Sequence, residues 1–162
     1  MEKIIIAAAA RNNVIGLGRE IPWYIAEDLR RFKSNTLGHT VIMGRTTWES
    51  LGAALPGRTN VVITGKTIPG AACFRSIPEA LRNIRSGERV FFIGGERIFR
   101  EALNIADTIE LTRIHRDYPG DRFFPDIDPG LWELAERGPV LESAGIPYSF
   151  MRYRRRTPGG GA

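Results

Sequence analysis

The chain has 162 residues, 43% of them hydrophobic, which is enough apolar material for one domain with a buried core. Its formal net charge is +5, and no apolar run is long enough to cross a membrane, so we expect no membrane partner. The apolar stretch after Met1 lacks a strongly basic leader, which favours a buried strand over a signal peptide. Cys73 is the only cysteine, which excludes an intrachain disulfide and fits the cytoplasm, where we expect the protein to reside.

Short apolar runs alternate with helical patterns along the chain. Strand-like runs cover residues 3–9, 40–44, 60–64, 89–94 and 108–114, and helical patterns cover about 25–36, 45–52, 77–86 and 96–104. The runs rich in Ile, Val and Phe are typical of strands buried on both faces, as in a parallel sheet. The segments 131–136 and 148–156 indicate a closing antiparallel pair.

These elements predict the fold class and the domain organisation. We expect a three-layer α/β/α sandwich around a mostly parallel mixed sheet with an antiparallel C-terminal edge. A single domain is expected over residues 1–156, followed by a disordered tail over 157–162.

Two neighbouring acids on the first predicted helix face in different directions. At about 100° per residue, Asp28 falls inside the apolar stripe that includes Leu29 and Phe32. Glu27 falls on the polar face, where we expect it to pair with Arg31. A lone carboxylate on an apolar face is costly unless something pairs with it. Asp28 is therefore either an internally paired acid or an acid that binds a ligand.

Two predicted strands end in glycine directly before a helix. The junctions are Gly44 followed by Arg45, Thr46 and Thr47, and Gly94-Gly95 followed by Glu96 and Arg97. Free N–H groups and the dipole at a helix start attract phosphate. One such junction is weak evidence, but two in a small domain indicate a ligand with two or more phosphates, such as a dinucleotide.

The usual dinucleotide fingerprint is absent, because the glycines of "GLGRE" lead into a loop rather than a helix. The strand 60–64 is followed by Gly65-Lys66 and not by an acid that could hold a ribose hydroxyl. Thr64, Lys66 and Arg45 instead suit a 2′-phosphate, which favours NADPH over NADH.

Eight stretches carry a family resemblance. They are "VIG" (14–16), "IPW" (21–23), "EDLRRFK" (27–33), "VIMGRTTWESLG" (41–52), "LPGRTN" (55–60), "VFFIGGERIF" (90–99), "LTRI" (111–114) and "GDRFFP" (120–125). In this order and spacing, the chain resembles a bacterial-type dihydrofolate reductase from end to end, except for the tail. The resemblance implies reduction of 7,8-dihydrofolate to tetrahydrofolate with NADPH, by hydride transfer to C6 and protonation at N5.

The resemblance also implies a substrate site. Asp28 would hydrogen-bond N3 and the 2-amino group of the pterin, because a carboxylate has two acceptors for that two-donor edge. Trp23 and Thr112 would reach the pterin through water, and together with Asp28 they form the implied catalytic set. The implied substrate-binding residues are Ile6, Ala7, Asp28, Phe32, Leu51, Leu55, Arg58, Ile93 and Thr112, with Arg58 on the α-carboxylate of the glutamate tail. From periodicity alone, the apolar members serve equally well as core.

The implied cofactor site is larger. Its residues are Ala8, Val14, Ile15, Gly16, Leu17, Gly18, Arg19, Glu20, Gly44, Arg45, Thr46, Thr47, Thr64, Gly65, Lys66, Arg75, Gly94, Gly95, Glu96, Arg97, Ile98, Phe99 and Glu101. The resemblance implies a cis peptide bond between Gly94 and Gly95, and a loop over residues 12–23 that closes as a lid. Ile21, Ala53 and Phe99 depart from frequent family choices.

Other interpretations involve different partners. A deaminated pyrimidine reductase of riboflavin synthesis has a similar fold but would not need the pocket of Trp23, Asp28 and Phe32. A nucleic-acid-binding module is indicated by the pI near 9.9 and by "RYRRR", but the basic residues are spread along the chain. We expect dihydrofolate and antifolates of the methotrexate or trimethoprim type as ligands, a monomer, and no nucleic acid. His39 and His115 are expected at the surface without a metal, and Cys73 is expected to be buried.

Overall fold

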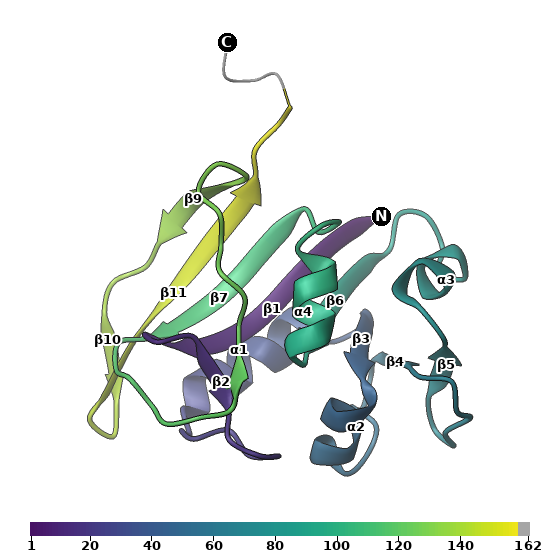
Figure 1. The fold of residues 1–162 in the computed structure, drawn as a ribbon, viewed down its shortest axis with the longest axis horizontal. Helices are drawn as coiled ribbons and strands as arrows, with labels where there is room; N and C mark the ends of the chain where they lie inside the picture. Colours follow the sequence, from purple (N-terminus) through teal and green to yellow (C-terminus); the bar gives the residue numbers. More distant parts are fainter. Residues whose placement is uncertain (159–162) are drawn as a thin grey trace.

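Strand β1 (Glu2–Ala10) lies in the middle of a nine-stranded sheet and is parallel to both neighbours, β6 (Arg89–Gly94) and β7 (Thr108–Ile114). The computed structural model describes residues 1–158, so the tail expected over 157–162 lies outside the described residues from residue 159 onwards. Figure 1 shows the sheet as the central layer of the molecule, with α4 in front of it and α1 behind.

The strand order of the main sheet is β10-β11-β7-β1-β6-β3-β4-β5, and β9 also pairs with β11. Its remaining strands are β3 (Thr40–Gly44), β4 (Thr59–Ile63), β5 (Ala72–Phe74), β9 (Trp132–Arg137), β10 (Leu141–Ser143) and β11 (Ile146–Arg155). Pairs among β1 and β3 to β7 are parallel, and the pairs that β11 makes with β7, β9 and β10 are antiparallel. The predicted mixed sheet with an antiparallel C-terminal edge is confirmed.

Helices cover both faces of the sheet. They are α1 (Ala26–Thr36), α2 (Arg45–Leu51), α3 (Ile77–Arg82) and α4 (Glu96–Ala102). Because successive side chains of a strand point to opposite faces, β1 serves two cores. Ile5 belongs to the cluster that contains Ile98 of α4, whereas Ile6 belongs to the cluster that Phe32 of α1 and Trp48 of α2 contact. This division produces the three predicted layers.

The predicted third helix is too long, since α3 ends at Arg82 rather than near residue 86. Its start is well marked, because the Ser76 Oγ accepts a hydrogen bond of 3.2 Å from the Glu79 backbone N–H. It ends in a turn at Asn83 and Ile84, whose N–H groups donate to the carbonyls of residues 80 and 81, and Gly87 follows five residues after Arg82 with a φ of +93°. Glycine tolerates this left-handed conformation, and a helix cannot continue through it.

Four short strands were not predicted: β5, β10, and the two that form a separate ribbon, β2 (Val14–Gly16) and β8 (Arg122–Phe123). Each has at most three residues, which is too short for an alternating pattern to be recognised. The β2–β8 ribbon matters for function because it ties the loop before α1 to the segment after β7 (Figure 1).

The basic C-terminal motif is held by protein contacts. Arg152 forms ion pairs with Glu110 and Glu136. Arg155 donates to the carbonyl oxygens of residues 103 and 106, and Arg156 donates to the carbonyl oxygen of residue 129. These contacts of Arg152, Arg155 and Arg156 give the arginines a structural use that requires no nucleic acid.

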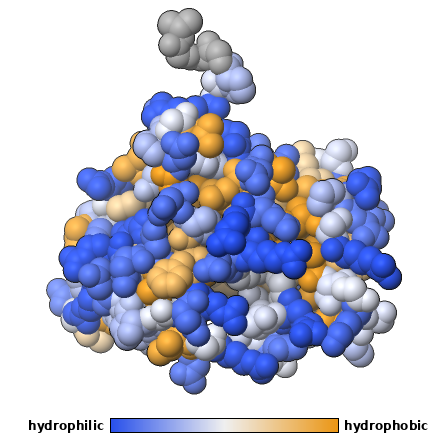
Figure 2. All heavy atoms as spheres, viewed as in Figure 1, coloured by the Kyte–Doolittle hydropathy of each residue, from blue (hydrophilic) through white to orange (hydrophobic). Residues whose placement is uncertain are grey.

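The face shown in Figure 2 is mostly hydrophilic, with hydrophobic side chains gathered in small groups.

Candidate active site

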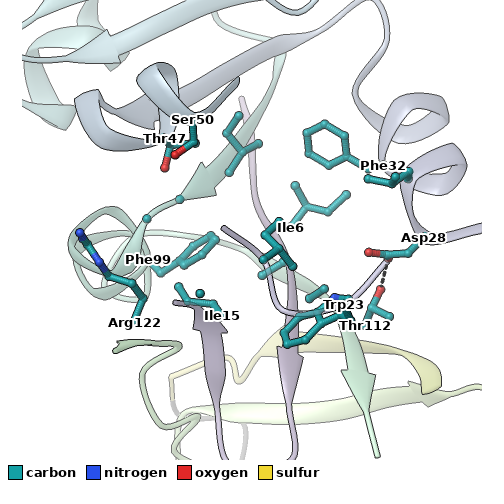
Figure 3. Close-up of a pocket in the computed structure, with 18 of the residues that line it drawn as sticks. Ile6, Ile15, Trp23, Asp28, Phe32, Thr47, Ser50, Phe99, Thr112 and Arg122 are labelled. Carbon is teal, nitrogen blue, oxygen red and sulfur yellow. Dashed lines mark hydrogen bonds between the residues drawn. The ribbon is translucent and has the colours of Figure 1, made fainter. Parts of the chain in front are cut away.

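A cavity of about 640 Å³ opens between α1, α2 and the carboxyl-end half of the central strands (Figure 3). Many of the predicted site residues line it, namely Ile6, Ala7, Ala8, Ile15, Gly16, Gly18, Arg19, Glu20, Trp23, Asp28, Phe32, Thr46, Thr47, Leu51, Ile93, Gly94, Gly95, Glu96, Phe99 and Thr112. Asp28 and Thr112 lie at one end, and Thr47, Ser50 and Arg122 lie at the other.

Asp28 is the acid at the end of the cavity where α1 faces β7. It stands in the first turn of α1 and accepts a hydrogen bond of 2.6 Å from the Thr112 hydroxyl on β7 (Figure 3). Burial raises the pKa of the Asp28 carboxyl above its usual value of 3.8, while the Thr112 hydrogen bond and the charge of Arg31 act in the opposite direction. The carboxylate therefore carries a desolvation cost that a ligand with two donors would offset.

The expected ion pair between Glu27 and Arg31 is wrong. Arg31 Nη2 instead lies 3.1 Å from Glu110 Oε2, and Glu27 accepts a hydrogen bond from the hydroxyl of Tyr148. Glu27 is exposed as predicted, but strand β11 brings an aromatic hydroxyl within its reach. The helical pattern contains no information about β7 and β11, the strands that supply both partners.

The other end of the cavity is built from small residues. Gly94 and Gly95 line it, and the peptide bond between them is cis, as the resemblance implied. A Cβ added to Gly94 would lie 3.3 Å from the ring of Phe99, and one added to Gly95 would lie 3.6 Å from the Thr47 hydroxyl. Side chains here would occupy the space beside Thr47 and Phe99, so the glycines keep that end of the cavity open for a ligand.

The loop over the cavity is tied to the segment that follows β7. Asp121 accepts a hydrogen bond of 2.9 Å from the Gly18 N–H, and its own N–H donates to the Gly16 carbonyl at 3.1 Å. Gly120 packs so closely that a Cβ there would lie 2.3 Å from Val14 Cγ1. These contacts position the loop residues that line the cavity.

Basic residues follow three adjacent strand ends. Gly44 of β3 is paired with Ile63 of β4, so Arg45 and Thr64 emerge side by side. The Thr64 N–H donates to the carbonyl of the residue before Arg75, with a distance of 2.8 Å. Ligands of α/β sheets gather at this carboxyl edge. Arg45 and Glu49 lie 3.4 Å apart, and the Arg45 side chain is half-exposed.

Some predicted site residues do not line the cavity. They are Val14, Leu17, Gly44, Arg45, Leu55, Arg58, Thr64, Gly65, Lys66, Arg75, Arg97, Ile98 and Glu101. Arg58 donates to the Thr36 hydroxyl at 3.1 Å and to the Pro56 carbonyl at 3.0 Å, and burial lowers its pKa. Leu55 packs against the core cluster on the α1 side of the sheet.

Several lining residues were missed by the sequence reasoning, including Tyr24, Leu29, Arg31, Ser50, Glu110, Arg122 and Phe150. A signal existed for two of them. Glu110 is two residues before Thr112 on one strand, so both share a face of the sheet. Ser50 follows Thr46 and Thr47 at helical spacing. Arg122 and Phe150 depend on long-range placement.

The two histidines are half-buried rather than at the surface. The His115 ring lies 2.7 Å from the Ser149 hydroxyl, and burial lowers its pKa; the His39 ring packs at 5.8 Å from that of Phe91. Cys73 is also half-buried, less than expected. Within residues 1–158 no group of histidine, cysteine and acidic side chains could hold a metal ion. In the same range, no helix is both long enough and apolar enough to cross a membrane.

The fold and the cavity together define a small α/β protein with a large ligand cavity, which has the Asp28 carboxylate at one end and glycines at the other. A family model described as dihydrofolate reductase matches residues 3–155. A dihydrofolate reductase of Neisseria gonorrhoeae is 42% identical over 154 residues, covering 92% of this chain and 95% of the relative. One from Bacillus subtilis is 35% identical over 156 residues, covering 93% of each chain.

A solved structure shares the fold. It is dihydrofolate reductase from Enterococcus faecalis complexed with NADP(H) and RAB-propyl, with a TM-score of 0.89 and 29% identity over 96% of this chain and 97% of that one. The chain belongs to the dihydrofolate reductase family. It therefore belongs to the NADPH-dependent oxidoreductases that reduce 7,8-dihydrofolate to 5,6,7,8-tetrahydrofolate.

Proposed function

We propose that this chain reduces 7,8-dihydrofolate with NADPH, and that Asp28 is the acid that holds the pterin. The observation that carries this assignment is the placement of Asp28 in an apolar cavity, with one oxygen bonded to Thr112. The two donors of the pterin edge match the acceptors of the carboxylate, and binding them would offset the cost of its burial.

The remaining pocket residues orient the substrate. Phe32, Leu51 and Ile93 give the cavity apolar walls on either side of a flat ring. Trp23 lies beside Asp28 and Thr112 at the same end of the cavity (Figure 3), where it is placed to share a water with the pterin. Because Asp28 holds the edge opposite N5, water delivers the proton to N5. Arg58 is assigned to the glutamate tail, and to bind it the guanidinium would exchange its contacts with Thr36 and Pro56.

The cofactor is assigned to the glycine-lined end of the cavity and to the adjoining surface. NADPH, when bound, supplies the hydride that is transferred to C6 of the substrate. Gly94, Gly95 and Thr47 would flank the nicotinamide half, because they line the end of the cavity that the two glycines leave without side chains of their own. Arg45, Lys66 and Arg75 at the carboxyl edge of β3 to β5 would hold the phosphates of the other half.

Further properties follow from the same reading. Antifolates of the methotrexate or trimethoprim type would bind in the pterin site, since they offer a similar two-donor edge to Asp28. Residues 1–156 would form a single catalytic domain that acts as a monomer in the cytoplasm.

One assay tests the proposed function. The purified chain is mixed with dihydrofolate and either NADPH or NADH, and loss of reduced cofactor is followed by absorbance. The expected result is oxidation that needs dihydrofolate and is much faster with NADPH. Equal rates with both cofactors would overturn the 2′-phosphate site, and no oxidation with either would overturn the function.

A further inference from the structure

Helix α1 and strand β7 meet at two successive pairs of side chains. Asp28 contacts Thr112, and three residues further along the helix, Arg31 contacts Glu110. Residues at i and i+3 share a face of a helix, and residues at i and i+2 share a face of a strand. The two contacts are therefore neighbouring rungs between the same two elements.

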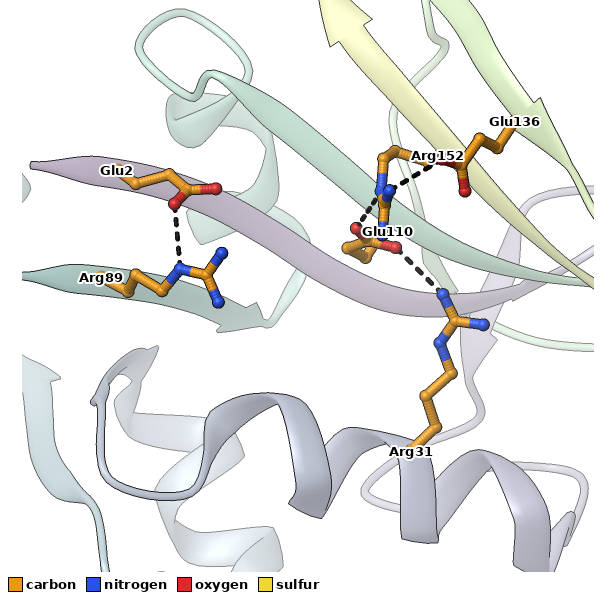
Figure 4. Close-up of polar contacts among 6 residues, drawn as sticks. All are labelled: Glu2, Arg31, Arg89, Glu110, Glu136 and Arg152. Atoms are coloured by element: carbon orange, nitrogen blue, oxygen red, sulfur yellow. Dashed lines mark hydrogen bonds and ion pairs between the residues drawn. The ribbon is translucent and has the colours of Figure 1, made fainter.

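The second rung continues into a chain of charges across the sheet (Figure 4). Glu110 bonds Arg31 through Oε2 and Arg152 through Oε1, and Arg152 Nη1 bonds Glu136 at 2.9 Å. Arg152 of β11 stands opposite Glu110 of β7 on one side and opposite Glu136 of β9 on the other. The Glu110 side chain is only 12% exposed, so its two cationic partners are what make its burial tolerable.

This rung faces the same cavity as Asp28. Arg31, Glu110 and Phe150 all line that cavity. The Arg31 guanidinium also lies over the Phe150 ring, 4.0 Å from its centroid, which fixes the arginine on a second side. The Arg31 guanidinium is thus held by Glu110 and by the Phe150 ring, and the side chain is only 33% exposed. Its charge therefore stays in a defined place beside Asp28.

The charged groups around Asp28 come from several elements. On α1 itself they are Glu27, Arg30 and Arg31, on β7 Glu110, and on β11 Tyr148, while Arg19 and Glu20 of the overlying loop line the same cavity. The charges of Arg31 and Glu27 act on the pKa of Asp28 in opposite directions, and that of Arg31 lowers it. Burial and Glu27 raise the pKa of Tyr148 from its ordinary value of 10 to about 12, so its hydroxyl adds no charge beside Asp28.

We propose that Arg31 and Glu110 are positioning residues for the substrate acid. Their ion pair sets how α1 lies against β7, and it holds one cation at a fixed place beside Asp28. This inference rests on the proposed role of Asp28 as the group that binds the pterin, and it adds two residues that touch neither reacting atom.

Opposite effects are expected from the two partners. Replacing Arg31 by methionine removes the cation and leaves Asp28 with a higher pKa. Replacing Glu110 by glutamine removes the acid paired with Arg31, while Arg152 keeps its ion pair with Glu136. The charge of Arg31 then acts on Asp28 without a competing carboxylate, so the pKa of Asp28 falls. A purely structural role for the pair would not give changes of opposite sign.

The test titrates Asp28 directly in the ligand-free full chain. Aspartate is labelled with ¹³C at its carboxyl group, and the Asp28 signal is assigned by its loss in Asp28→Asn. Arg31→Met should raise the pKa and Glu110→Gln should lower it. Arg30→Met is the matched control, since Arg30 is the exposed neighbour on the same helix and does not line the cavity; it should leave the pKa unchanged. Arg31→Lys keeps the charge and should restore most of the wild-type value.

Steady-state kinetics provide the second readout. Arg31→Met should raise KM for dihydrofolate roughly tenfold while changing KM for NADPH little. The inference is overturned if Asp28 titrates alike in all variants, if both partners shift it in the same direction, or if Arg30→Met shifts it as much as Arg31→Met. The titration needs no turnover, so an inactive wild-type chain would overturn the proposed function while this result is still obtained.

Discussion

Thr112 donates its hydroxyl proton to Asp28 Oδ1 at 2.6 Å, which joins the third strand from the antiparallel edge to the helix that carries the substrate acid. The hydrogen bond stabilises the charged form of Asp28. It also uses up one lone pair of Oδ1, so the rest of the carboxylate is presented to the cavity in one orientation.

Thr112→Val keeps the shape of the side chain and removes this donor. The pKa of Asp28 should rise further, because burial would then be opposed only by Arg31. A hydrogen bond to a charged group is worth about 1.5–3 kcal/mol, so kcat/KM for dihydrofolate should fall by roughly one to two orders of magnitude. Steady-state assays check the fall and ¹³C titration checks the pKa; an unchanged pKa would contradict the proposed role of Thr112.

The stability of the ligand-free chain should depend on Asp28 with a defined sign. Its pKa is raised in the folded state, so the folded chain binds the proton more tightly than the unfolded chain does. Stability linked to Asp28 is therefore fully present below the usual value of 3.8 and is lost as the pH rises through the folded pKa.

Asp28→Asn should therefore be more stable than the wild type at neutral pH, with the difference vanishing in acid. Urea unfolding across this pH range measures the difference. Glu142→Gln, which changes an exposed acid on β10, is the control and should show no such trend. A variant that is less stable at neutral pH would mean that the carboxylate is better paired than its burial indicates.

Gly120→Ala should disturb the loop over the cavity. The added Cβ would lie 2.3 Å from Val14 Cγ1 and 2.6 Å from the Gly16 carbonyl oxygen, so the β2 segment has to move. A displacement of this size in a segment that lines the cavity should slow turnover by about 10- to 100-fold. Pre-steady-state rates would show the loss, and Pro119→Ala, an exposed neighbour, should be close to wild type. Wild-type rates in Gly120→Ala would show that the ribbon does not position the loop for catalysis.

Arg45→Ala should weaken NADPH binding far more than NADH binding. Arg45 stands at the carboxyl edge of β3 beside Thr64, where a 2′-phosphate is assigned, and it is currently paired with Glu49. Loss of a charge-assisted contact of about 1.5–3 kcal/mol corresponds to roughly 10- to 150-fold in the NADPH dissociation constant. Fluorescence titration with each cofactor measures this, with the exposed Arg82→Ala as the control. Equal losses for both cofactors would remove Arg45 from the phosphate site.

The predictable parts of this molecule are those that a local pattern determines. Strands β3, β6 and β7 begin and end where their apolar runs do. The helical period was enough to predict that Asp28 faces the apolar side of its helix. The Arg31 assignment failed because an exposed position on an isolated helix is indistinguishable from one that faces a strand. Its partner Glu110 lies 79 residues away in sequence, and the Tyr148 partner of Glu27 lies 121 residues away.

The residues of the site also divide into those that a local pattern predicts and those that only long-range contacts place. Motif residues such as Gly94 and Thr47 could be placed because a strand end and a helix start are both local signals. Arg122 and Phe150 line the cavity only because the β2–β8 ribbon and β11 fold back on the central strands. Tertiary pairing of this kind leaves no periodic trace in the segment that contributes the residue.

The central claim is that Asp28, and not its neighbour Glu27, binds the pterin. It is tested most directly by the steady-state turnover of dihydrofolate by Asp28→Asn and Glu27→Gln at neutral pH, with NADPH binding measured alongside. Asp28→Asn should bind NADPH normally and lose about 10²- to 10⁴-fold in turnover, the range for a positioned ionisable group. Glu27→Gln, which loses only a contact with Tyr148 outside the cavity, should stay close to wild type. An active Asp28→Asn beside an inactive Glu27→Gln would contradict the assignment of the substrate acid.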